Sequence, residues 1–165
     1  MVLLSFSAAL AKDYFLEVST GSGSEETNLF SRIGVFKDDG SIDWGNKIKI
    51  GKGKSASAAL QGKSTVLVYK GSQADTEDDL FYRVGTVDLT TMVPTWGPEV
   101  KYSKGSAPAV TLKGTRVVEV HQSPSKDTIW IINGVIDTQR QQITWGTSTK
   151  YDEAGRGPDI SLETE

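Results

Sequence analysis

Few side chains in this 165-residue sequence could carry out catalysis. The sequence contains one histidine and no cysteine, so His/Cys metal sites, thiol nucleophiles and most catalytic triads lack a component. His121 could serve a Ser-His-acid site, but no nucleophile elbow accompanies it, and we expect an ordinary exposed histidine on a strand. Glu17 and Glu119 occupy equivalent places in two different repeats, which separates them too widely for a glycosidase pair. The sequence therefore predicts no enzyme and requires no cofactor.

One acidic stretch, at 38–43 (DDGSID), places oxygen ligands around a glycine, as calcium loops do. It lacks the remaining features of a twelve-residue calcium loop, and the other repeats do not contain it. A hairpin turn built on Asp-Gly explains the stretch better. We therefore place no metal ion.

Tryptophan is the aromatic residue that recurs at regular spacing. Trp44, Trp96 and Trp145 lie 52 and 49 residues apart, and a glycine follows each of them. Each ring could offer an aromatic face to the apolar side of a sugar, or it could belong to the core between repeats. A lysine recurs five residues after each tryptophan, and Tyr102 and Tyr151 directly follow two of these lysines. These polar groups could donate hydrogen bonds to hydroxyls, or they could lie on a solvated strand face.

The segments around each Trp-Gly step repeat in the same order, and such a period identifies the architecture. A small-residue segment comes first, an alternating strand second and an apolar strand third. The small-residue segments are 57–60 and 107–112, with echoes at 7–10 and 158–162. The alternating strands are 14–19, 65–70 and 116–121, and the apolar strands are 29–34, 80–85 and 129–134. Together with the Trp-Gly strand, each unit predicts four short strands joined by polar turns, without helices.

We therefore expect an all-β fold and a single repeat domain over residues 1–165. The units span about 7–57, 58–106 and 107–157, and 158–162 repeats the first strand. Two architectures use four-stranded units of this length, the β-propeller and the β-trefoil. The count of three units favours the trefoil, because propellers need more blades. The small residues of the first strand, the two apolar middle strands and the outer Trp-Gly strand are typical of propeller blades. We predict β-propeller-like units, with the trefoil as the alternative.

Charge and hydropathy exclude several kinds of partner. The net charge is −3 and basic residues are interspersed with acidic ones, so we expect no nucleic acid partner. No apolar run approaches the ~20 residues that span a bilayer. Residues 1–11 have some features of a signal peptide but lack its basic n-region, so the compartment stays open.

Four segments give the repeat a likeness to a known family: 108–110 (PAV), 117–120 (VVEV), 81–84 (FYRV) and 95–97 (TWG). The pattern resembles the sialidase-like lectin propellers of bacteria and fungi, including the fucose-binding and tectonin-like types. The hydrolytic members use an arginine cluster, a tyrosine nucleophile and an acid, and this sequence shows no such set. The resemblance therefore implies binding without hydrolysis. Three blades would leave such a ring unfinished, so we expect a homodimer that completes six blades.

The fucose-type members bind through an Arg, a Glu and a Trp in each site, and these residue types recur here in part. Arg32 and Arg83 align, whereas the third unit has isoleucine. Glu17 and Glu119 align, whereas the second unit has Val68. Only the first unit contains both, and its Glu precedes its Arg, the reverse of the family order. A structural Arg-Glu pair between neighbouring strands explains the first unit at least equally well.

These expectations converge on a multivalent carbohydrate-binding protein whose partners are glycans or glycoproteins. We expect its sites between adjacent repeats, near the Trp-Gly strands, where linked weak sites gain avidity. The candidate binding residues are Trp44, Trp96, Trp145, Glu17, Arg32, Arg83, Glu119, Tyr102 and Tyr151. The alternative is a protein-interaction scaffold or toxin-associated module that does not bind sugar. A degraded sialidase-like enzyme is a third hypothesis, disfavoured by the missing catalytic groups.

Overall fold

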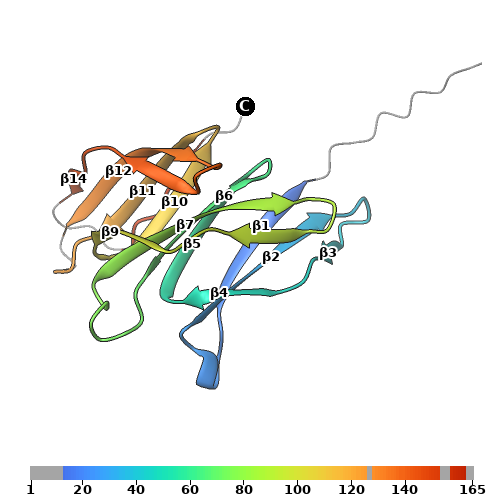
Figure 1. Cartoon of the computed structure of the whole chain (residues 1–165), viewed down its shortest axis with the longest axis horizontal. Helices are drawn as coiled ribbons and strands as arrows, with labels where there is room; N and C mark the ends of the chain where they lie inside the picture. Colours follow the sequence, from blue (N-terminus) through green and yellow to red (C-terminus); the bar gives the residue numbers. More distant parts are fainter. Residues whose placement is uncertain (1–12, 126–127, 153–156, 163–165) are drawn as a thin grey trace, which may run out of the picture.

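The chain folds into β-strands that form three antiparallel sheets (Figure 1). The computed structural model describes residues 13–125, 128–152 and 157–162. Over these ranges it contains no α-helix, only a short 3-10 turn at Gly23–Glu25, and no helix long and apolar enough to cross a membrane. The all-β expectation is confirmed.

Each sheet is formed by consecutive strands of the chain. The first sheet contains β1 (Tyr14–Thr20), β2 (Asn28–Phe36), β3 (Ile42–Trp44) and β4 (Ile48–Lys52). The second contains β5 (Lys54–Gln61), β6 (Ser64–Lys70), β7 (Asp79–Asp88), β8 (Val93–Trp96) and β9 (Val100–Lys104). The third contains β10 (Ser106–Lys113), β11 (Arg116–Gln122), β12 (Ile129–Asp137), β13 (Gln142–Trp145) and β14 (Thr149–Asp152). In each sheet the last two strands pair with the same long strand, so the outer strand is split just after its tryptophan.

The four strand positions expected of each unit are present in the second and third sheets. In the described part of the first sheet only three positions are filled, by β1, β2 and the split pair β3 and β4. The echo at 7–10 and the signal-peptide-like stretch at 1–11 lie outside the described residues. The echo at 158–162 is described, and it does not form a strand in this structure.

Local sequence explains where the hairpins turn. β5 joins β6 through Gly62 (φ 56°), and β10 joins β11 through Gly114 (φ 60°). Two-residue hairpin loops need positive φ values, which glycine adopts without steric strain. The first part of the acidic stretch, 38–41, lies in the turn between β2 and β3, and the Gly40 amide donates a hydrogen bond to the carbonyl of Lys37 at 2.9 Å. The hairpin turn expected there is confirmed.

The strand pairing defines which residues are equivalent in the three sheets. A glycine near the end of the long strand pairs with the tryptophan in every sheet: Gly34 with Trp44, Gly85 with Trp96 and Gly134 with Trp145. On its other side each glycine pairs with Phe15, Thr65 or Val117. Counting from these pairs, the equivalents of Glu17 are Leu67 and Glu119, and those of Ser19 are Tyr69 and His121.

This register corrects the alignment made from the sequence. A constant offset of 51 residues placed Val68 at the position of Glu17, but the residue that pairs with Arg83 is Leu67. A shift of one residue moves a side chain to the opposite face of a sheet. Leu67 accordingly lies on the face toward the first sheet, and Val68 on the face toward the third.

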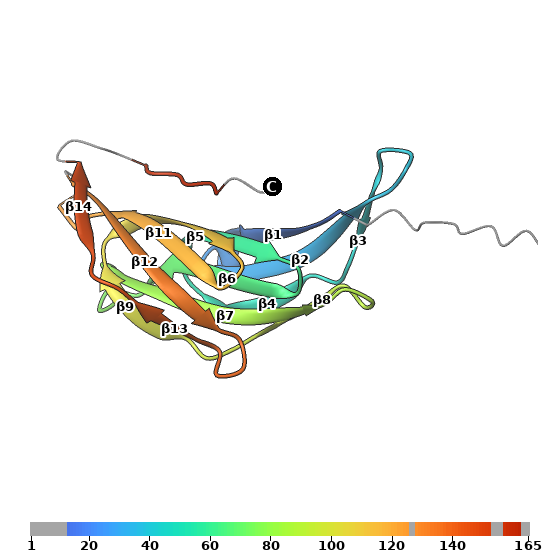
Figure 2. The same cartoon turned by 90° about the horizontal axis from the view of Figure 1, so that it is seen from above.

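The second sheet lies between the other two (Figure 2). One apolar cluster joins it to the first sheet and contains Leu29, Leu67 and Tyr69. Another cluster joins it to the third sheet through side chains such as Val66, Val84 and Val117. The three sheets form an open arc and do not close into a barrel.

Candidate functional site

The recurring tryptophans pack toward the preceding sheet in chain order. The indole Nε1 of Trp96 donates a hydrogen bond to Ser31 Oγ of the first sheet at 3.0 Å. Trp145 contacts the second sheet, where its ring lies 5.8 Å from that of Tyr82 and 5.1 Å from that of Tyr102, centroid to centroid. Trp96 and Trp145 therefore belong to the core between repeats, the second of the two roles considered for them.

Trp44 occupies the equivalent position in the first sheet, where no described sheet precedes it. Its side chain is 38% exposed and contacts Phe15 edge-on at 5.1 Å. The Arg32 guanidinium lies 3.8 Å from the centre of the indole and also bonds Glu17 at 3.0 Å. The structural Arg-Glu pair between neighbouring strands is confirmed for the first unit.

Glu119, another candidate, lies in the interior between the second and third sheets. Its side chain is fully buried and accepts a hydrogen bond from the Tyr102 hydroxyl at 2.7 Å. Its other oxygen lies 2.9 Å from Nδ1 of His121, and the other ring nitrogen of His121 lies 3.4 Å from Ser103 Oγ. The expectation that His121 is an exposed strand histidine was wrong, because sheet stacking leaves this residue only 3% exposed.

Ser103, His121 and Glu119 contact one another in sequence and have the residue types of a Ser-His-acid triad. At the equivalent positions between the first and second sheets stand Gly51, Tyr69 and Leu67. The cluster therefore replaces an apolar contact of the neighbouring interface, and we interpret it as a buried polar network of the core.

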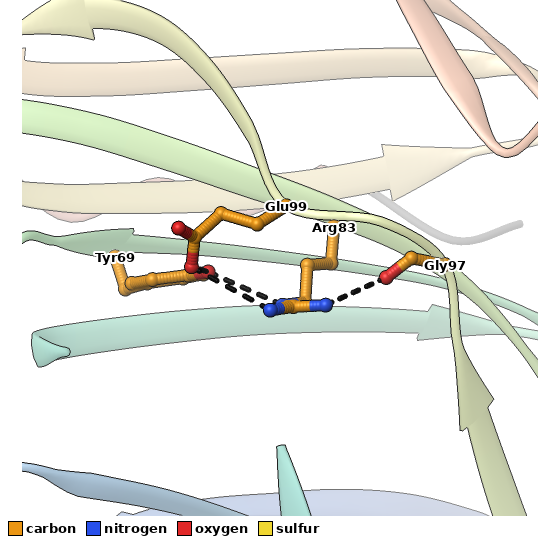
Figure 3. A network of polar contacts seen from close by, with 4 residues as sticks. All are labelled: Tyr69, Arg83, Gly97 and Glu99. Carbon is orange, nitrogen blue, oxygen red and sulfur yellow. Dashed lines mark hydrogen bonds and ion pairs between the residues drawn. The ribbon is translucent and has the colours of Figure 1, made fainter. Parts of the chain in front are cut away.

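A polar network with an accessible carboxylate surrounds Arg83 on the second sheet (Figure 3). Its Nη1 donates a hydrogen bond to the carbonyl of Gly97 at 2.8 Å, and its Nε donates one to the Tyr69 hydroxyl at 3.2 Å. The Tyr69 hydroxyl in turn donates to Oε2 of Glu99. Arg83 Nη2 lies 3.5 Å from the same oxygen. The guanidinium is thus bound to the loop that follows Trp96, and the Glu99 side chain remains 41% exposed.

The network borders a cavity between the first and second sheets. The cavity has a volume of about 220 Å³. Its lining comes from β4, β7, the loop after β6 and the loop after β8: Lys52, Gly71, Ser72, Gln73, Thr76, Phe81 and Glu99. One side is aromatic, because the Phe81 ring stacks on that of Tyr69 with the centroids 5.9 Å apart. The cavity thus offers a carboxylate, an ammonium group, small hydroxyls and an aromatic ring within one small space.

No protein-family model matches the chain, and no curated protein matches it. The function must therefore be inferred from the side chains themselves. Among the residues that the structure describes, no three His, Cys, Asp or Glu side chains are grouped to hold a metal ion. Hydrogen bonding and aromatic contact are the chemistry that the cavity supports.

The structure brings only Arg83, of the nine predicted binding residues, into the network beside this cavity. Tyr102 and Glu119 bond each other in the core, and Tyr151 is exposed on the third sheet. Glu99 and Tyr69 are not among the residues predicted from the sequence. One signal was present: the third residue after each tryptophan is Lys47, Glu99 or Ser148, so only the second unit carries an acid there.

Two tyrosines of these networks predict how stability depends on pH. Burial raises the pKa of Tyr69, and its hydrogen bond to Glu99 raises it further. Burial also raises the pKa of Tyr102, followed by the nearby charge of Glu119. In the unfolded chain both hydroxyls ionise near pH ~10. Because the folded pKa values are higher, the stabilisation is complete below that pH and is lost as the pH rises above it.

We therefore expect the free energy of unfolding to decline above pH ~10, by up to about 1.4 kcal/mol per pH unit for each tyrosine. Urea denaturation at a series of alkaline pH values measures this slope. Tyr69→Phe and Tyr102→Phe should each make the decline shallower, and Tyr14→Phe serves as the control. Equal slopes in the wild type and in the Tyr69→Phe/Tyr102→Phe double variant would contradict the prediction.

Proposed function

We propose that this chain is a carbohydrate-binding protein and that the cavity beside Glu99 is one of its sites. The observation that carries the proposal is the asymmetry of the Glu99 carboxylate. Oε2 is bound by Tyr69 and lies beside Arg83, whereas Oε1 has no hydrogen-bond partner among the described residues. A carboxylate fixed through one oxygen is oriented before binding, so the other can accept hydrogen bonds from a ligand with little loss of entropy.

The remaining lining suits one sugar ring. Sugar hydroxyls need several donors and acceptors, and Lys52 and Gln73 supply these next to Glu99. The Phe81 ring offers the apolar surface on which the C–H groups of a sugar can pack. The volume of about 220 Å³ is smaller than the roughly 300–1,000 Å³ typical of drug-sized ligands. A single monosaccharide unit, such as the end of a glycan, is therefore the ligand class that we propose.

Equivalent sites in the other sheets would differ in chemistry. Lys47 and Ser148 stand where the second sheet has Glu99, so we assign the carboxylate site to the contact between the first and second sheets alone. We also propose that the three sheets are consecutive blades of a propeller-like ring completed by a second chain. A dimer would then present two such sites, and linked sites can raise avidity by about 10²- to 10⁴-fold.

Glu99→Gln is expected to weaken glycan binding by about 10- to 100-fold. Hydrogen bonds to charged groups contribute about 1.5–3 kcal/mol, and 1.4 kcal/mol corresponds to a factor of ten. A broad glycan array identifies the ligand, and calorimetric titration with that glycan measures the loss. Glu77→Gln, a change of an exposed acid on the nearby loop, is the matched control and should bind as the wild type does.

Two results would contradict the proposal. One is an array on which the wild type binds no glycan, and the other is unchanged affinity in Glu99→Gln. Capture of a protein partner that free sugars do not displace would instead support the scaffold hypothesis.

A further inference from the structure

The two ends of the arc are open faces of different character (Figure 2). On the first sheet, an aromatic face contains Phe15, Phe36, Ile42 and Trp44, with Phe36 54% exposed. On the third sheet, the outermost face carries Val135, which is 54% exposed, and Tyr151, which is 76% exposed. Exposed apolar faces of this kind usually mark contact surfaces.

The internal contacts show what each face is built to meet. Trp96 and Trp145 each lie over the same two positions of the preceding sheet. One position is three residues before the glycine that pairs with that sheet's own tryptophan, and the other is six residues after that tryptophan. In the first sheet these positions hold Ser31, to which Trp96 donates a hydrogen bond, and Ile50, which packs against the same apolar cluster as Trp96. In the second they hold Tyr82 and Tyr102, which pack against Trp145.

The third sheet has the same two positions, and no tryptophan of the described chain occupies them. They hold Ile131, which is partly exposed, and Tyr151, which is the 76% exposed ring. Among the described residues, no sheet precedes Trp44 of the first sheet. The described chain thus has one Trp-Gly tryptophan, Trp44, with no sheet to pack on, and one pair of positions, Ile131 and Tyr151, with no tryptophan over it.

A second repeated contact follows the same rule. The hairpin tip of each following sheet packs on the glycine after the tryptophan of the preceding sheet. A Cβ placed on Gly45 would lie 2.4 Å from the carbonyl oxygen of Met92, and one on Gly97 would lie 2.7 Å from Cβ of Gln141. For Gly146 the nearest atoms all belong to Asn133 of its own sheet.

The unused hairpin tip is the exposed turn at 38–41 of the first sheet. Its charge matches the opposite face, because it carries Asp38 and Asp39. A cavity of about 540 Å³ on the third sheet is lined by Gly146 together with Arg116 and Val135. An acidic turn entering this cavity would meet a basic side chain.

We propose that a second copy of this chain covers both faces, an inference that rests on the ring proposed above and not on sugar binding. The aromatic face of each copy packs on the outer face of the third sheet of the other, so that two identical contacts close a ring of six sheets. Trp44 then lies over the positions of Ile131 and Tyr151, as Trp145 lies over Tyr82 and Tyr102. Each contact joins two different surfaces, and two-fold symmetry closes the pair.

Light scattering during size-exclusion chromatography should give the mass of two chains for the wild type. Trp44→Arg on the aromatic face and Val135→Arg on the outer face of the third sheet should each weaken the dimer by more than about 100-fold. Each change alters both contacts, because each contact uses one face of either kind. Lys63→Glu, on an exposed hairpin of the second sheet, should remain dimeric. If Trp44→Arg does not fold, Ile42→Arg tests the same face.

Mixing the two variants separates this arrangement from other dimers. A mixed pair contains one contact made of two unaltered faces, so equimolar Trp44→Arg and Val135→Arg should form a mixed dimer although neither forms one alone. A monomeric wild type at high concentration would overturn the proposal. So would failure of the two variants to associate, because a contact between identical surfaces gains no intact interface on mixing.

Discussion

Glu119→Leu is expected to lower the free energy of unfolding by about 2 to 6 kcal/mol, since each buried polar group left without a partner costs about 1–3 kcal/mol. The two groups that would lose their partner are the Tyr102 hydroxyl and Nδ1 of His121. We expect little steric misfit, because the equivalent residue of the second sheet is a leucine, Leu67, in an apolar cluster. Urea denaturation followed by tryptophan fluorescence measures the loss.

Two controls separate the unpaired groups from other causes. The triple variant Tyr102→Phe/Glu119→Leu/His121→Phe removes the polar groups of the three bonded side chains while retaining the rings, and of the network only Ser103 Oγ remains, so it should recover most of the loss. Glu17→Leu makes the same change at the equivalent position of the first sheet. There the ion pair with Arg32 is partly exposed, so we expect a loss below about 1 kcal/mol, compared at a dilution where the wild type is monomeric. A triple variant no more stable than Glu119→Leu would contradict this explanation.

The repeat and the all-β fold could be predicted because their signals are local. A Trp-Gly step and a glycine-ended apolar strand recur in each unit, and both are visible in the sequence. The register of β6 could not be predicted in this way. Aligning the units by a constant offset ignores where each hairpin places its glycine, and Gly85 pairs with Thr65 in the second sheet whereas Gly34 pairs with Phe15 in the first. This shift of one residue in the alignment decides on which face of the sheet Leu67 lies.

The candidate site was harder to predict because its residues meet through non-local geometry. Glu99 reaches Arg83 only because the outer strand breaks after Trp96, and no periodic pattern predicts where such a loop returns. The burial of His121 likewise depends on one sheet stacking on another. Exposure of a strand residue follows from its neighbours in space, so the sequence of β11 alone could not reveal it.

The two sheet contacts use the same positions with different chemistry. Ile50 and Leu67 give an apolar contact between the first and second sheets, whereas Tyr102 and Glu119 give a hydrogen-bonded one between the second and third. Apolar contacts tolerate alternative partners, while a buried network requires each of its members to be matched. We therefore expect the second contact to be the more sensitive to single changes.

Trp145→Ala is expected to lower the free energy of unfolding by about 3–5 kcal/mol, the range found when large aromatic side chains are removed from a core. The indole packs on Tyr82 and Tyr102 and covers the apolar cluster that joins the third sheet to the second. Hydrogen exchange should show the third sheet losing protection first, because its contact with the rest of the chain is the one weakened.

Trp145→Phe is the conservative control for this change. Comparing it with Trp96→Phe separates the effect of the indole N–H from the effect of ring size. The indole Nε1 of Trp145 is buried without a partner among the described residues, so phenylalanine removes an unsatisfied donor and should be far less destabilising than alanine. Trp96→Phe removes a donor that is bonded to the buried Ser31, so its loss should exceed that of Trp145→Phe by about 1 kcal/mol. The reverse order would mean that ring size, and not the state of the indole N–H, determines what each contact requires.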